Sequence, residues 1–191
     1  MITEKNKNTN PLAEAQKEMR FAFLGGFAGQ LVAGVIWLSA AAASYFHSPP
    51  LGMLVLFFGS MGIFPLNLIV LRMMGRPAKV SEGNVLWSLG SQIAFTVPIN
   101  FLLVGVVILF RPIWFFPAAM IVVGAHYLPF ITLYGMRSYA LPAIILVVLG
   151  AVLALYGPAL FSLGGWITGV VLLVFAFYSR MVVLKEEDSA Q

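Results

Sequence analysis

The chain has 191 residues, of which 61% are hydrophobic and only 9% are charged, and its formal net charge is +4. Soluble domains usually carry about 25% charged residues, so this composition excludes an ordinary soluble globular protein and makes lipid the expected solvent. Without cysteine, the chain has no disulfide framework, thiolate metal site or thiol nucleophile. The positive charge does not indicate nucleic-acid binding, because the lysines and arginines flank apolar segments, where they would face lipid headgroups.

The first 20 residues form a polar N-terminal segment. Asn10 and Pro11 match a helix N-cap followed by proline at the first helical position. Four apolar side chains then share one helical face: Leu12, Ala15, Met19 and Phe23. We expect a short amphipathic helix on the inner leaflet that runs into the membrane; the alternative is a frayed tail up to Pro11.

A single transmembrane domain is predicted for residues 21–182. A membrane helix needs about 20 mostly apolar residues, and six stretches satisfy this. Their expected bounds are 21–46, 51–71, 85–110, 113–134, 139–157 and 160–179. An acidic tail follows at 183–191, and we expect no regular structure after Lys185. The fold class is therefore an all-α, six-span polytopic bundle.

The charges predict the orientation. Ten of the eleven lysines and arginines fall on one side of the predicted bundle, and Arg111 is the exception. Because cytoplasmic loops are enriched in Lys and Arg, both termini are predicted to be cytosolic. Aromatic residues with a polar atom are expected at the inner membrane boundary, and four lie there: Trp87, Tyr134, Tyr139 and Tyr178.

The predicted spans contain no Asp or Glu, which disfavours ion coupling through a buried carboxylate. The fourth span instead carries His126 and Tyr127, three and two residues before Pro129. Proline removes a helical hydrogen bond and leaves the carbonyl of Ala125 without its partner. These groups either line a solute-binding or proton-handling site or only hydrogen-bond between helices.

The third span carries a polar ridge at i+4 spacing: Ser88, Gln92, Thr96 and Asn100. Thr96 and Asn100 lie at about the depth of His126, and Pro98 frees the carbonyl of Ala94 in the same span. Two kinked helices with polar groups at matching depth would line a cavity. The alternative is that the ridge only joins helices.

Other residues suggest packing and lipid roles. Pro65 is a third predicted kink. Small residues that permit close helix contact are Gly25 and Gly29 in the first span and Gly165 and Gly169 in the sixth. The basic cluster of the second loop is expected to set the topology or to bind anionic headgroups: Arg72, Arg76 and Lys79.

Enzyme signals are weak. Ser60 and His126 could form a nucleophile and base, but the sequence around Ser60 lacks the glycine two residues earlier that a nucleophile elbow requires. We identify no catalytic constellation, metal site or cofactor site, and we do not expect an enzyme.

Three segments carry a resemblance. They are Trp37-Leu38, Gly62 to Leu66, and Val123 to Phe130, which contains a Gly-Ala-His-Tyr-Leu-Pro motif. Over roughly residues 20 to 155 the chain resembles a family of small bacterial integral membrane proteins classed as a domain of unknown function. The resemblance implies a bacterial cytoplasmic membrane but no activity.

The leading functional hypothesis is a non-enzymatic membrane protein that binds or passes a small neutral or weakly polar solute. The site would be formed by Gln92, Thr96, Asn100, His126 and Tyr127. The first alternative is a structural or accessory subunit, and the second is an intramembrane hydrolase. Expected partners are lipids, a solute and, since small-residue stripes allow it, further copies of the chain.

Overall fold

The computed structural model describes residues 10–189, and this part of the chain is all-α. Most of the longer helices coincide with the apolar runs of the sequence, and α8 continues past its apolar run into a charged segment. The elements are α1 (Pro11–Phe23), η1 (Leu24–Gly26), α2 (Phe27–Phe46), α3 (Pro49–Met61), α4 (Ile63–Met73), α5 (Trp87–Phe110), η2 (Pro112–Trp114), α6 (Phe115–Tyr134), η3 (Arg137–Tyr139), α7 (Ala140–Tyr156) and α8 (Leu163–Asp188).

Within residues 10–189, five helical stretches are long and apolar enough to cross a membrane, and there are six if α3 and α4 form one bent span. The chain is thus a multi-pass membrane protein. The predicted second span is not one straight helix, because α3 and α4 meet at Gly62 with a bend of 57°. Pro65 follows within one turn. Since proline has no N–H to donate to the carbonyl four residues earlier, it weakens the helix at this bend.

The predicted amphipathic helix is confirmed as α1. The Asn10 side chain accepts a hydrogen bond from the Leu12 N–H at 3.0 Å, which caps the helix that begins at Pro11. The face with Ala15 and Met19 is buried against the rest of the chain. Residues 1–9 of the predicted N-terminal segment lie outside the described residues.

The helix is interrupted between α1 and α2, inside the first candidate membrane stretch, Pro11–Phe46. Residue 21, the expected start of the first span, lies near the end of α1. Three residues in succession adopt positive φ: Leu24 at 51°, Gly25 at 58° and Gly26 at 82°. α2 therefore begins only at Phe27. A Cβ atom on Gly26 would collide with the Tyr139 hydroxyl, so this position requires glycine both for its backbone conformation and for space.

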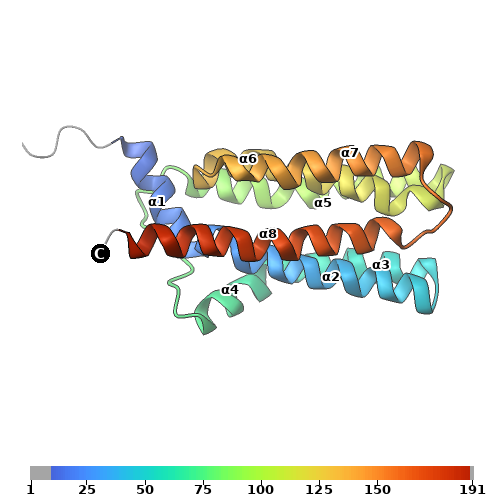
Figure 1. Cartoon of the computed structure of the whole chain (residues 1–191), viewed down its shortest axis with the longest axis horizontal. Helices are drawn as coiled ribbons and strands as arrows, with labels where there is room; N and C mark the ends of the chain where they lie inside the picture. Colours follow the sequence, from blue (N-terminus) through green and yellow to red (C-terminus); the bar gives the residue numbers. More distant parts are fainter. Residues whose placement is uncertain (1–9, 190–191) are drawn as a thin grey trace, which may run out of the picture.

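The helices form two layers (Figure 1), with α5, α6 and α7 in one and α2, α3, α4 and α8 in the other. Within the layers α2 packs closely along α8 and α3, and α6 packs along α7. α5 contacts mainly α6. The predicted packing glycines lie at contacts within the chain: Gly25 with Val183, Gly29 with Asn67, Gly165 with Phe116 and Ala41, and Gly169 with Leu38.

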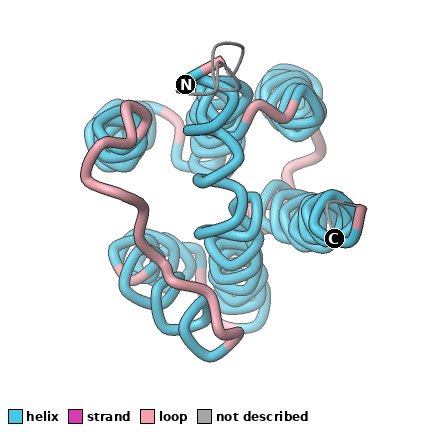
Figure 2. The backbone as a smooth tube through the Cα atoms, turned by 90° about the vertical axis from the view of Figure 1, so that its left-hand side faces the viewer, coloured by secondary structure: helices cyan, strands magenta, loops and turns pink. Residues whose placement is uncertain are grey.

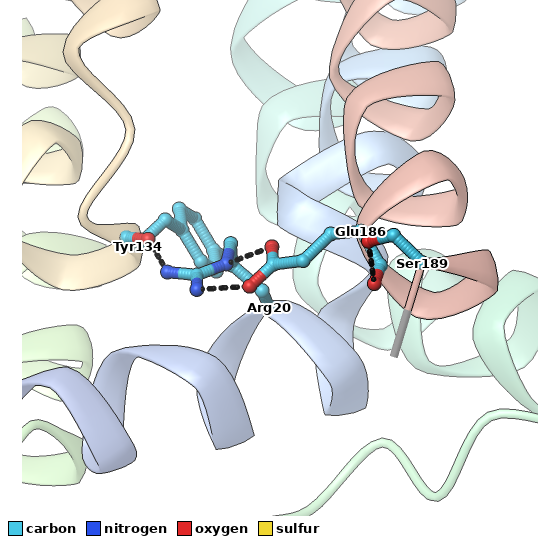
Figure 3. A network of polar contacts seen from close by, with 4 residues as sticks. All are labelled: Arg20, Tyr134, Glu186 and Ser189. Atoms are coloured by element: carbon cyan, nitrogen blue, oxygen red, sulfur yellow. Dashed lines mark hydrogen bonds and ion pairs between the residues drawn. The ribbon is translucent and has the colours of Figure 1, made fainter. Parts of the chain in front are cut away.

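The end of the bundle that holds α1 and the C-terminal part of α8 is here named the charged end. Figure 2 looks onto this end, where a long loop, residues 74–86, crosses between α4 and α5. Arg20 on α1 makes a bidentate ion pair with Glu186 at 2.6 and 2.7 Å and donates to the Tyr134 carbonyl at 2.6 Å (Figure 3).

A second ion pair joins Arg76 in the same loop to Glu187, at 2.6 and 2.8 Å. These two pairs correct the expectation for the tail. The segment after Lys185 is helical through Asp188, as the end of α8, because its carboxylates have cationic partners on α1 and on the loop. The expected boundary at residue 183 therefore falls inside a continuous helix.

The Gly26 position gives a first prediction. Gly26→Ala should lower the thermal unfolding temperature in detergent, because a left-handed conformation costs an L-residue about 1–2 kcal/mol and the new methyl group meets Tyr139. Gly75→Ala is the matched control, since Gly75 also has positive φ (71°) but would find no atom within 4 Å of a new Cβ. Equal losses in the two variants would contradict the close approach of Tyr139.

The Arg20–Glu186 pair gives a second prediction. A double-mutant cycle with Arg20→Gln and Glu186→Gln, measured by unfolding in detergent, should give a coupling of about 1 kcal/mol, the upper range for pairs near the surface. The hydrogen bond from Arg20 holds the pKa of Glu186 below its ordinary value of 4.5. The contribution of the ion pair to the free energy of unfolding is therefore complete above pH 4.5, and it is lost as pH falls through the folded-state pKa of Glu186.

The exposed Glu14 supplies the control for this cycle. Glu14→Gln should leave unfolding within about 0.5 kcal/mol of the wild type. If Glu186→Gln lowers the free energy of unfolding by the same amount in acid as at neutral pH, the carboxylate charge does not act through Arg20.

Candidate functional site

The predicted polar residues of the third and fourth spans meet where α5 packs on α6. Thr96 Oγ1 lies 3.0 Å from His126 Nδ1 and donates to the Ile93 carbonyl, one turn earlier on α5, at 2.7 Å. Thr96 is exposed on the surface of the chain and His126 is half-buried. The equal depth that the sequence predicted for these two side chains is therefore realised as a direct contact.

The other members of the predicted ridge are arranged differently. The Asn100 amide donates to the Thr96 carbonyl at 2.8 Å, so it turns back along α5 and does not cross to α6. Gln92 is exposed and makes no hydrogen bond to any residue between 10 and 189. The structure thus brings Thr96 and His126 into contact, bonds Asn100 to the backbone of Thr96, and gives Gln92 no hydrogen bond to either of them.

Tyr127 lies next to His126 and contacts its ring. It is buried, and its ring stacks on Tyr139 with centroids 5.9 Å apart. The His126 ring makes T-shaped contacts with the rings of Tyr127 and Phe130, at centroid distances of 5.8 and 5.1 Å. His126 thus contacts two aromatic rings as well as Thr96, while Tyr127 itself belongs to the core.

The sequence analysis missed a buried network at the break between α1 and α2. The Tyr139 hydroxyl donates to the Gly25 carbonyl at 2.5 Å and accepts from Gln30 Nε2 at 2.6 Å. Tyr139 was expected at the membrane boundary with its hydroxyl toward water, but it is fully buried. The adjacent glycines Gly25 and Gly26 are the sequence signal of a break that needs such a partner.

The three prolines have different effects. Pro65 lies beside the bend between α3 and α4, as predicted. Pro98 and Pro129 lie inside α5 and α6, and each of these helices remains one continuous element.

The basic cluster is also divided by the structure. Arg76 pairs with Glu187 and lies over the Phe21 ring at 5.0 Å, so its guanidinium is engaged within the chain. Arg72 and Lys79 are exposed and remain accessible to anionic headgroups.

Two shallow hollows lie at the charged end, on either side of α1. One of about 560 Å³ includes Glu18, Phe21 and Ser81, and one of about 490 Å³ includes Lys17, Val183 and Glu187. His126 lines neither of them. Among residues 10–189, no three His, Asp or Glu side chains are grouped so that they could hold a metal ion.

A family model matches residues 12–181 of this helical bundle, which includes all of the long apolar helices. The chain belongs to DUF7010, a family described as of unknown function. This confirms the resemblance to a domain of unknown function and extends it through the sixth span. No curated protein and no solved structure matches the chain.

The buried network gives a third prediction for this DUF7010 protein. Tyr139→Phe leaves the Gly25 carbonyl and the Gln30 amide buried without their hydroxyl partner, which should cost about 1–3 kcal/mol of unfolding free energy. Tyr178→Phe is the control, because the Tyr178 ring is exposed and its hydroxyl makes no hydrogen bond within residues 10–189. Equal stability of the two variants in detergent would refute the role assigned to Tyr139.

Proposed function

We propose that this protein binds a small neutral or weakly polar solute, or lets it pass, at the Thr96–His126 contact. The observation that carries the proposal is a histidine inside a membrane helix, half-buried and hydrogen-bonded across α5 and α6 to an exposed threonine. Ionisable residues inside membrane spans are costly and usually mark a site. The absence of Asp and Glu from the apolar helices up to Ser179 disfavours charged solutes, which would lack a counter-charge.

The proposed setting is a bacterial cytoplasmic membrane with the charged end in the cytosol. The basic residues of the described chain other than Arg111 belong to segments at that end of the bundle (Figure 1), and the positive-inside rule then places it in the cytosol. Arg72 and Lys79 would contact anionic headgroups of the inner leaflet there.

A structural or accessory subunit is the second candidate. It is favoured by the hydrogen bonds that Thr96 and Asn100 donate to the backbone of their own helix. The hydrolase hypothesis has less support, since the Ser60 hydroxyl donates to the Leu56 carbonyl of its own helix at 2.6 Å. We propose no enzymatic activity.

Cysteine labelling tests the solute site, since the wild type contains no cysteine. Single cysteines at Thr96 and Asn100 should react with a small charged methanethiosulfonate added to cells or to inverted vesicles, because a solute path must admit water. Ile99→Cys is the control at the same depth, since Ile99 is an exposed apolar residue of α5 that should face lipid.

Reaction at 96 and 100 but not at 99 would support a wet path along α5. Ala159→Cys, at an exposed position in the turn before α8, serves as the positive control for reagent and protein. If only Ala159→Cys reacts from either side, the polar contact is dry, and the structural role replaces the solute site.

A further inference from the structure

We infer that the Thr96–His126 site offers hydrogen-bond acceptors to its ligand, and that it therefore selects neutral solutes that carry an O–H or N–H donor. This inference rests on the proposed solute site and specifies the ligand's chemistry. It follows from the acceptors to which the hydroxyl of Thr96, the imidazole of His126 and the amide of Asn100 already donate.

The threonine hydroxyl has a single proton to donate. Thr96 Oγ1 is 2.7 Å from the Ile93 carbonyl, which can only accept, and 3.0 Å from His126 Nδ1. Donation to the carbonyl is the common back-bond of threonine within a helix. The hydroxyl oxygen then accepts from His126, so Nδ1 carries the ring proton.

This assignment leaves the second ring nitrogen as an acceptor. An imidazolium would be an unpaired charge in lipid, because the apolar helices up to Ser179 contain no carboxylate, so the ring has one N–H. With that N–H on Nδ1, Nε2 holds a lone pair. Nε2 makes no hydrogen bond to any residue of the described chain, 10–189.

Asn100, one turn after Thr96 on α5, carries a second unused acceptor. Its Nδ2 donates to the Thr96 carbonyl, whereas its Oδ1 has no hydrogen bond from the described residues. The rings of Tyr127 and Phe130 contact the His126 ring with apolar surface. Unpaired acceptors in an apolar setting favour a ligand that supplies donors, and they disfavour anions and ligands with only acceptor atoms.

Nitrogen-15 NMR of histidine-labelled wild-type protein in lipid nanodiscs tests this directly. The protein has two histidines. The spectrum of the His126→Asn variant identifies the His126 signals, and His47, at the C-terminal end of α2, serves as the internal control. The resting spectrum should show a protonated Nδ1 and an unprotonated Nε2 for His126. Titration with N-methylacetamide, which has one N–H, should shift the Nε2 signal saturably.

N,N-dimethylacetamide is the matched probe, because it differs by one methyl group and has no donor. It should leave the Nε2 signal unchanged at the same concentrations. A protonated Nε2 at rest, or equal shifts with both amides, would overturn the inference. Cysteine labelling at 96 and 100 would still stand in that case, so failure of the ligand chemistry is separable from failure of the solute site.

Discussion

The hydrogen bond from Tyr139 to the Gly25 carbonyl is the interaction on which the two layers of this bundle depend. In lipid a backbone group that leaves its helix must find another partner, and the turn of three positive-φ residues before α2 creates that need. Tyr139 meets it from η3, at the junction of α6 and α7. The same ring stacks on Tyr127 and Tyr134 and meets Phe175 of α8, so one side chain contacts both layers.

The charged end adds a second connection of a different kind. Arg20 joins α1 to the end of α8 and to the last carbonyl of α6, and Arg76 joins the long loop to the next residue of α8. Bidentate pairs of this geometry orient the groups that they connect. The amphipathic α1 is thus held on the bundle by buried apolar residues on one face and by the Arg20–Glu186 ion pair at its end.

The α5–α6 contact differs from both connections, because α5 is held mainly by α6 and exposes much of its surface. Thr96 and Asn100 donate their hydrogen bonds to carbonyls of the α5 backbone. His126 contacts Thr96 through Nδ1, and its Nε2 has no hydrogen-bond partner among the described residues. A purely structural contact would gain from satisfying all of these atoms. Because His126 Nε2 and Asn100 Oδ1 lack hydrogen-bond partners among the described residues, this contact is the best candidate for a ligand-binding site.

The sequence by itself determined the all-α class, the apolar helices, the N-cap at Asn10 and the equal depth of Thr96 and His126, because apolar runs, caps and axial rise are local properties. Only the tertiary structure decided that Tyr139 is buried, that Gln92 is exposed without a hydrogen bond to the other polar residues, and that the acidic end of α8 is helical. Each of these depends on a partner more than 50 residues away or on which neighbour a helix face meets. A spacing of four residues places side chains on one face, but it cannot say whether lipid, water or another helix lies opposite.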